Sequence, residues 1–315
     1  MNSRMSTKNL LQVVVLALLA LTVLVVPYLG NTYLIKIVIN MCILIGLAAS
    51  WNLVGGLAGQ LSFGHAAFFG MGAYVLAIAS DHQIPYPVAF LLGGAGAVVL
   101  SCVAYPTFRT SGTYFAIITI AFLESARLLA VNMEWVTHGN SGYIIMDSFR
   151  SNDLFPYYLI ALIAALILFL TWLIIHSRFG LRLRALNQDQ NAAQDLGVPV
   201  QRYKMLSLAI SAFFCGVLGA YYAKYIGFID PESVFSIRWS FDMIMMSIIG
   251  GLGTFFGPII GAIVLTIMSE IFRLTFPSLS LLAYGALMMA MIVFWPSGIV
   301  GLFERLSSKF QNQKE

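Results

Sequence analysis

The stretch SRFGLRLRALNQDQNAAQDLGVPVQR, from Ser177 to Arg202, is a polar segment within an otherwise apolar chain. Apolar runs at 156–175 and 203–226 flank it, and each is close to the ~20 residues that a helix needs to cross a bilayer. The segment is too long for a tight turn and too short for a domain. It therefore predicts a structured loop between two membrane-spanning helices, and the alternation of apolar runs and polar loops decides the fold class.

The composition also indicates a membrane protein. Of the 315 residues, 60% are hydrophobic and 10% are charged, and the mean hydropathy is +0.88. A soluble domain is nearer half apolar and about a quarter charged, so one soluble core could not bury this chain. We predict an all-α polytopic membrane protein in contact with lipid. The net charge of +4 does not indicate nucleic acid, because the basic residues lie mainly in loops.

Ten apolar runs are predicted to span the membrane. They are 10–29, 33–54, 55–80, 88–105, 113–131, 156–175, 203–226, 241–256, 258–276 and 279–296. The first follows Arg4 and Lys8, which is also typical of a cleavable signal peptide, but no small-residue cleavage site ends it. We therefore expect a retained span and a single transmembrane domain over 1–315.

The basic residues predict the orientation. An even number of spans places both termini on one side, and with the N-terminus inside, 11 of the 17 Lys and Arg residues fall in inner loops or tails. Cytoplasmic loops carry such an excess of positive charge. We expect a bacterial cytoplasmic (inner) membrane protein with both termini and the 177–202 loop in the cytoplasm.

The segment GGLAGQLSFGHAAFFGMGAYVLAIAS, residues 55–80, contains six glycines. Non-helical backbone at membrane depth is tolerated only where protein or a water-filled cavity covers it, so the segment fits a broken helix that lines a substrate path. Gln60, Ser62 and His65 are then candidates for that path. Glycines equally serve close helix packing, and a single histidine is more often a packed, hydrogen-bonded side chain.

Two further features of the apolar runs have a functional and a structural interpretation. GGL recurs at 250–252 with glycines spaced four apart behind it, which fits two related halves, as in many transporters, or close helix contact alone. Glu124 and Arg127 share a helix face at i,i+3. Ionisable residues within spans are often functional, but this pair could simply neutralise itself near a helix end.

A short helix is predicted inside the 177–202 loop. Asn187 or Asp189 can cap its start, and Gly197 followed by Pro199 ends it. Its small apolar face, Ala192, Ala193 and Leu196, suits close docking into a groove of a partner. The alternative is a polar connector folded onto its own membrane domain.

The loop resembles the coupling loop of ABC-importer permeases, which has two alanines and, after three intervening residues, a glycine. Here these are Ala192, Ala193 and Gly197. More narrowly, the loop, the segment AASWNLVGGLAGQLSFGHAAFFGMGAY (48–74) and the closing FWPSGIVG (294–301) resemble LivM-type permeases of the branched-chain amino acid uptake family. The resemblance covers nearly the whole chain.

The resemblance implies a division of labour. This chain lacks the G-x-x-x-x-G-K-[ST] phosphate loop, so it would bind no cofactor itself and ATP and Mg would sit on two separate ABC ATPase subunits. A second, LivH-like permease and an external substrate-binding protein would complete the importer. The residues that the resemblance implies for ATPase coupling are Arg184, Ala185, Asp189, Gln190, Ala192, Ala193, Leu196 and Gly197.

Two positions depart from the family, and other functions remain open. Gln190 stands where the family usually has an acidic residue, and Trp295 where it often has arginine. Some branches of the family take urea or short amides in place of branched-chain and related amino acids. An ion-coupled secondary transporter is a further alternative, although it has no need for a docking helix. No recognisable catalytic spacing indicates an enzyme, and no metal site is expected.

Overall fold

The computed structural model describes residues 22–110, 112–149, 154–294 and 298–301. Six segments are long and apolar enough to cross a membrane. They are α2 (Thr32–Asn52) with its π-helical end η2 (Leu53–Leu57), α4 (Tyr86–Ala104) with the start of the 3-10 turn η3 (Tyr105–Arg109), α5 (Gly112–Asn132), α7 (Phe155–His176), α10 (Val200–Ile226) and α13 (Phe256–Thr275). The predicted all-α polytopic class is therefore confirmed.

The remaining elements are shorter. The helices are α3 (His65–Asp81), α6 (Glu134–Thr137), α8 (Arg178–Gln188), α9 (Gln190–Asp195), α11 (Pro231–Val234), α12 (Ile237–Gly250) and α14 (Ser280–Phe294). Short 3-10 turns lie at Val26–Leu29 (η1), Gly139–Ser141 (η4) and Pro277–Leu279 (η5), and the strands β1 (Tyr143–Ile144) and β2 (Phe228–Ile229) pair antiparallel.

The predicted count of ten spans stays a prediction. Most of the first predicted span, 10–29, lies outside the described residues. The predicted spans at 55–80, 241–256 and 279–296 overlap α3, α12 and α14, which have 17, 14 and 15 residues. At 1.5 Å per residue these helices reach roughly 21–26 Å, which is less than the ~30 Å of a bilayer core.

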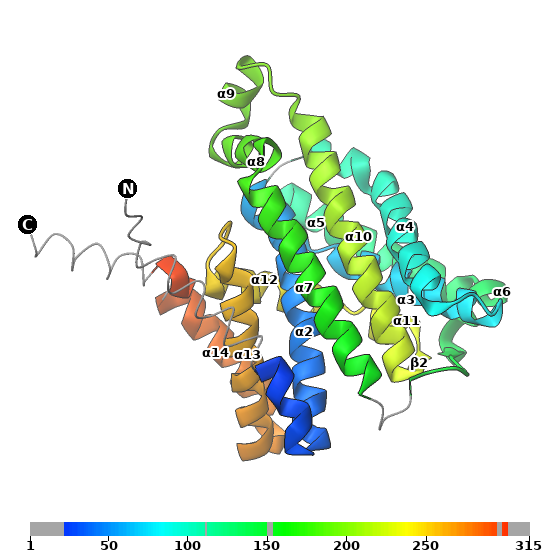
Figure 1. Ribbon diagram of the computed structural model, residues 1–315. Coiled ribbons are helices and arrows are strands. Elements are labelled where there is room, and N and C mark those ends of the chain that lie inside the picture. Colours follow the sequence, from blue (N-terminus) through cyan, green and yellow to red (C-terminus); the bar gives the residue numbers. More distant parts are fainter. Residues whose placement is uncertain (1–21, 111, 150–153, 295–297, 302–315) are drawn as a thin grey trace, which may run out of the picture.

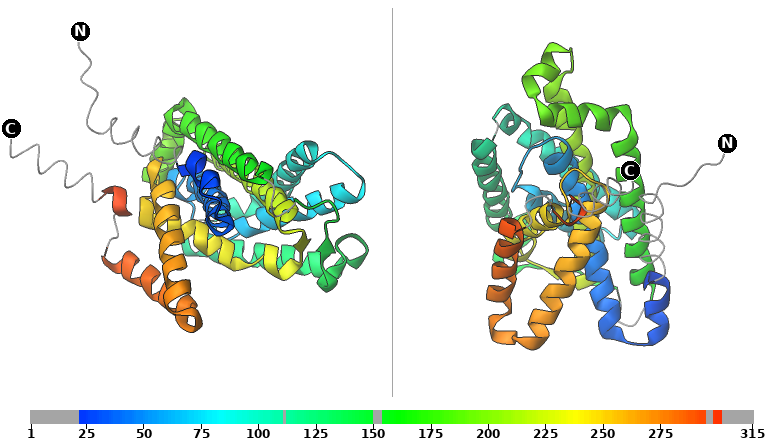
Figure 2. Two further views of the ribbon diagram at one scale, coloured as in Figure 1. Left: turned by 60° about the horizontal axis from the view of Figure 1, so that its bottom comes forward. Right: turned by 90° about the vertical axis from the view of Figure 1, so that its left-hand side faces the viewer.

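Helix α2 lies at the centre of the molecule. It packs against α7 and α10 on one side and against α12 and α13 on the other (Figures 1 and 2). Its C-terminal half is continuously buried, as expected of a helix that is apolar all round. By contrast, α5 and α7 keep many large apolar side chains exposed, which is what a lipid-facing helix requires.

Helices α3, α4 and α10 pack through small residues. A Cβ atom on Gly72 would lie 2.0 Å from the carbonyl oxygen of Gly216, and one on Gly216 would lie 2.6 Å from that of Gly93. Only glycine allows the backbones to approach this closely. The structural interpretation of the glycine-rich 55–80 segment, close helix packing, is therefore present in the structure.

The two GGL motifs meet at one end of α2. After η2 the chain leaves the helix at 58–64 and re-enters as α3, so the predicted helix break is also present. Asn52 lies between the motifs: its Oδ1 accepts from the Gly253 amide at 2.9 Å, and its Nδ2 donates to the Thr254 carbonyl at 2.9 Å. Contact between the motifs does not test whether the halves are related.

The molecule has two distinct ends (Figure 1). Helix α7 leads directly into α8 and α9, which project beyond the bundle together with the start of α10. At the other end of α10, β2 pairs with β1 and the Lys224 ammonium forms an ion pair with Asp147. The C-terminal end of α2 faces the first end, because the Asn187 side chain of α8 donates to the Gly56 carbonyl at 3.0 Å.

Candidate functional site

Helix α8 is fixed to the membrane domain at the start of the 177–202 loop. The Ser177 hydroxyl caps its N-terminus by accepting from the Gly180 amide at 3.3 Å, and Leu183 and Leu186 are buried. The Tyr203 ring stacks on Phe179 with the ring centroids 5.3 Å apart, and the Arg182 guanidinium lies over the same ring at 5.4 Å. Arg184 and Ala185 stay exposed on the outer face.

Helix α9 begins at an Asp189 cap and ends in a Schellman motif. The Asp189 carboxylate accepts from the Asn191 and Ala192 amides at 2.8 and 3.1 Å. Gly197 has φ +82°, its amide donates to Gln194, and the Val198 amide donates to the Ala193 carbonyl. This is the hydrogen-bond pattern of a left-handed helix cap. The predicted short helix with a glycine end is present, with Asp189 rather than Asn187 as its cap.

The predicted apolar face of α9 is divided between two environments. Ala193 is buried against the rest of the chain, whereas Ala192 is exposed and the Leu196 side chain is 85% exposed. Ala192 and Leu196 are four residues apart, so they lie on the same side of the helix. The loop therefore presents a small apolar surface at its outermost point.

Gln190, the position where the chain departs from the family pattern, contacts a buried lysine. Its side-chain oxygen accepts from the Lys204 ammonium at 3.0 Å, and Lys204 is only 2% exposed. Among the described residues no ion pair includes Lys204. The amide of Gln190 is thus a neutral partner for a buried cation and links α9 to α10.

The three residues predicted for the substrate path are buried together near the helix break. The Ser211 hydroxyl donates to the Ser50 carbonyl at 2.6 Å, so the proton between Ser211 and His65 belongs to His65 Nε2, at 3.0 Å. Nδ1 then accepts from Ser62 at 3.1 Å, and both ring nitrogens are satisfied within the chain. Gln60 Oε1 is buried without a hydrogen-bond partner among the described residues.

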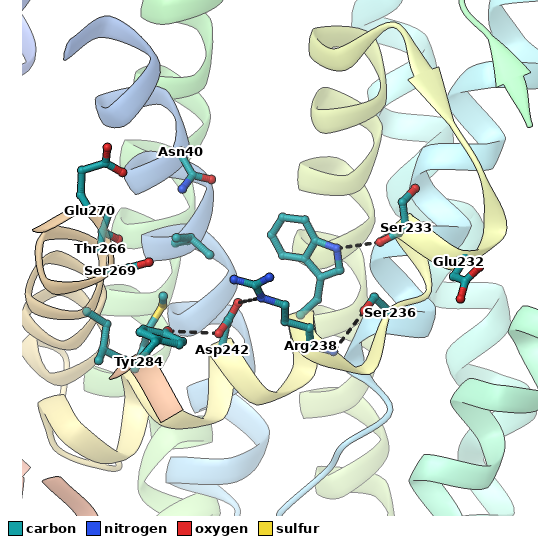
Figure 3. Close-up of a pocket in the computed structure, with 14 residues that line it drawn as sticks. Asn40, Glu232, Ser233, Ser236, Arg238, Asp242, Thr266, Ser269, Glu270 and Tyr284 are labelled. Carbon is teal, nitrogen blue, oxygen red and sulfur yellow. Dashed lines mark hydrogen bonds and ion pairs between the residues drawn. The ribbon is translucent and has the colours of Figure 1, made fainter. Parts of the chain in front are cut away.

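A separate pocket of about 370 Å³ lies between α2, α11, α12, α13 and α14. Asn40 from α2 and Glu270 from α13 lie far along their helices from the Asn52–Thr254 contact, so the pocket is in the half of the molecule away from α8 and α9. Figure 3 shows Asp242 near its centre. Its charged and hydroxyl-bearing lining includes Glu232, Arg238, Asp242, Thr266, Glu270 and Tyr284.

Asp242 connects two walls of this pocket. The Tyr284 hydroxyl of α14 donates to Asp242 Oδ1 at 3.1 Å, and Arg238 Nε lies 3.9 Å from Oδ2, one turn back on α12. The Asp242 side chain is 15% exposed, and that of Arg238 is 64% exposed. Glu270 is instead paired with Arg273 at 2.5 Å and accepts from the Tyr33 hydroxyl.

The predicted Glu124–Arg127 pair forms on α5, with Arg127 Nη2 2.5 Å from Glu124 Oε1. Neither residue lines the pocket. Over the described residues, no group of three or more His, Cys, Asp or Glu side chains is arranged to hold a metal ion. Trp295, the second departure from the family pattern, lies outside the described residues.

Comparison with known proteins identifies the family. Residues 33–292 match the family described as branched-chain amino acid transport system / permease component. The chain belongs to this family. This permease is 29% identical over 321 residues to the high-affinity branched-chain amino acid transport system permease protein LivM of Escherichia coli K12, covering 90% of this chain and 74% of that protein.

Two other relatives extend the comparison. The permease is 25% identical to the LivH permease of Escherichia coli K12, covering 81% of this chain and 90% of LivH. It is 23% identical to the probable LivM of Methanocaldococcus jannaschii, covering 65% of each protein. No solved structure matches the chain.

The pocket of the permease is the feature that the sequence interpretation missed. A signal for it was available, because Arg238, Asp242 and Glu270 are ionisable residues in or beside apolar runs, and such residues often mark functional sites in membrane proteins. Their positions do not show that they converge with Asn40 and Tyr284. That convergence depends on the packing of α2, α12, α13 and α14.

Proposed function

We propose that this chain is the transmembrane permease subunit of an ATP-driven ABC importer for branched-chain or related amino acids. It would pair with a second, LivH-like permease and with two ATPase subunits that bind ATP and Mg. An external binding protein would deliver the substrate. In this proposal the chain itself is not an enzyme and lies in a bacterial cytoplasmic membrane with both termini in the cytoplasm.

The observation that carries the proposal is α9. Its ends are fixed by Asp189 and Gly197, its Ala193 side is held by the membrane domain, and Leu196 is exposed at the tip. A rigid helix with small side chains suits docking into a groove. Force applied there would reach α7 through α8 and α10 through Gln190 and Lys204.

Coupling to ATP would work as a rigid-body switch. Closure of the ATPase pair would push α8 and α9, and the helices that continue from them would move with the loop. The Asn187–Gly56 and Asn52–Gly253 hydrogen bonds join this loop to both glycine-rich turns. A push on the loop would therefore act on α2, α3 and α13 together.

The decisive experiment is uptake by the complete complex in proteoliposomes. We expect leucine uptake that requires ATP and the ATPase subunits and that persists in the presence of a protonophore. Uptake that continues without the ATPases and collapses with the protonophore would instead establish an ion-coupled secondary transporter. Uptake of urea or short amides in preference to leucine would establish the other substrate branch.

A further inference from the structure

The pocket between α2 and α11–α14 contains an arginine and an aspartate, Arg238 and Asp242, that are close but form no direct hydrogen bond. Arg238 Nε and Asp242 Oδ2 are 3.9 Å apart, whereas charge-assisted hydrogen bonds are about 2.7–2.9 Å long. Charged side chains within a membrane domain are costly unless they face water, a partner or a ligand. Each of the two groups can therefore form a further hydrogen bond or ion pair.

Of the two pocket carboxylates on α12 and α13, Asp242 and Glu270, it is Asp242 that can accept a further partner. Tyr284 orients the Asp242 carboxylate through Oδ1, and Oδ2 faces the pocket and Arg238 (Figure 3). The Glu270 carboxylate already has Arg273 at 2.5 Å and the Tyr33 hydroxyl as partners. A cationic ligand group would thus replace no existing strong contact at Asp242.

Thr266 provides an independent sign of a missing partner. It lines the pocket, is only 7% exposed, and its hydroxyl has no hydrogen-bond partner among the described residues. Buried hydroxyls are normally hydrogen-bonded, and an exception needs an explanation. The hydroxyl oxygen itself is buried, so a ligand would satisfy it once the Thr266 side chain turned toward the pocket.

The pocket also has an apolar part of suitable size. Leu44, Met246 and Leu265 contribute to its wall. Its volume of about 370 Å³ is near the lower limit of ligand pockets, which run from about 300 to 1,000 Å³. A small molecule with one cationic group, one anionic group and a short aliphatic side chain fits this combination.

We propose that this pocket binds the transported amino acid as a zwitterion, with Arg238 taking the carboxylate and Asp242 the ammonium group, and with Thr266 turning its hydroxyl toward the ligand for a further hydrogen bond. The identity of the ligand as an amino acid rests on the proposed function. The position of the pocket, in the half of the molecule away from α8 and α9, places this site on the outer side of the predicted topology. Urea carries neither charge and would not use the pair.

The first test varies the ligand and leaves the protein unchanged. Radiolabelled leucine is bound to the purified complex in nanodiscs without ATP, and unlabelled competitors are added. We expect 4-methylpentanoate, which lacks the ammonium group, and 3-methylbutylamine, which lacks the carboxylate, to compete at least tenfold more weakly than leucine. Equal competition by either compound, or no leucine binding by the complex, would overturn the zwitterion site.

The second test varies the protein. Asp242→Asn and Arg238→Gln should each weaken leucine binding at least tenfold, and the matched pair Glu124→Gln and Arg127→Gln on α5 should not. Size-exclusion profiles and ATPase activity show that each complex has assembled. Unchanged binding in an assembled Asp242→Asn complex would overturn the assignment. Loss of ATP dependence with intact leucine binding would overturn the proposed function and leave this site standing.

Discussion

The α8–α9 loop and the membrane pocket are the two places where polar residues interrupt the apolar helices, and they are built in opposite ways. The loop comes from one continuous stretch, and its ends are set by neighbours in sequence such as Asp189 and Gly197. The pocket draws on five helices from Asn40 to Tyr284. A local site is specified by capping and turn chemistry, whereas a convergent site is specified only by packing.

The two regions also differ in what they leave unsatisfied. At the loop the unpaired surface is apolar and exposed, because Leu196 projects away from the chain. In the pocket the unpaired group is polar and buried, because the Thr266 hydroxyl has no partner among the described residues. An exposed apolar residue suits a protein partner, and a buried polar group suits a small ligand. Substitutions at each region should therefore have separable effects.

The largest expected effect is at the end of α9. Gly197 has φ +82° and open space around it, so Gly197→Trp strains the left-handed cap and adds bulk where a partner would dock. We expect the variant to insert in the membrane but to lose ATP-driven uptake and co-purification with the ATPases. Leucine binding in the pocket should be unchanged.

Gly30 is the matched control for this variant. It also has a positive φ, +63°, and no atom lies within 4 Å of the point where a Cβ would be. It lies at the end of η1, away from the loop. Gly30→Trp should retain ATPase co-purification and most uptake. Normal coupling in Gly197→Trp would show that α9 is not a docking element.

A smaller effect, on the stability of the permease, is expected at Asn52, whose side chain links the two glycine-rich turns. Asn52→Ala leaves the Gly253 amide and the Thr254 carbonyl without their partner. The cost is below the ~1–3 kcal/mol of a fully buried unpaired group, because both hydrogen bonds are only partly buried. We expect a clear fall in the thermal unfolding temperature of the purified permease. Asn132→Ala is the control, because Asn132 is exposed and its side chain donates to the Leu128 carbonyl of its own helix.

Equal stability of the Asn52→Ala and Asn132→Ala variants would contradict this prediction. Such a result would mean that the glycine-rich turns are held together by helix packing alone. The loop and the pocket would then communicate through α7 and α10 rather than through the turns at Asn52.

The difference between features set by neighbouring residues and features set by packing explains how much could be predicted from the sequence. The membrane class, the short helix, its glycine end and the Glu124–Arg127 pair follow from composition, caps and helix spacing, and they are present in the structure. Gly197 is informative because a left-handed cap depends on one residue and its immediate neighbours. The coupling role of the loop remains a prediction.

The buried polar residues show why the rest could not be predicted. Gln60, Ser62 and His65 stand out in sequence because they interrupt an apolar segment, yet the His65 ring is satisfied by Ser62 and by Ser211 on α10. Its partner is 146 positions away, and no local pattern connects the two. The Thr266 hydroxyl looks ordinary in sequence, and only packing shows that it lacks a partner.

A several-fold effect on binding is expected at Thr266. Thr266→Val keeps the shape but removes the hydroxyl, so leucine binding should weaken if that hydroxyl contacts the ligand. Thr171 on α7 is a matched control, because its hydroxyl is also buried without a partner among the described residues and does not line the pocket. Thr171→Val should leave binding unchanged. Equal binding by both variants would remove Thr266 from the site.

The smallest expected effect concerns Gln190 and the buried Lys204. Gln190→Glu places a carboxylate opposite an ammonium group that now has an amide oxygen at 3.0 Å, and hydrogen bonds between charged groups are stronger than those to neutral ones. We expect a gain of about 1 kcal/mol in the free energy of unfolding, with uptake retained. Gln190→Ala should have the opposite sign, because it leaves the buried ammonium unpaired.

Gln194→Glu is the control for charge alone, since Gln194 lies on the same short helix with an exposed side chain. It should not change the unfolding temperature. If Gln190→Glu were destabilising, the cost of removing the carboxylate from water would exceed its attraction to Lys204. A neutral residue at position 190 would then be the more stable choice for this loop, and the departure from the family pattern would be an adaptation to a buried, fully packed lysine.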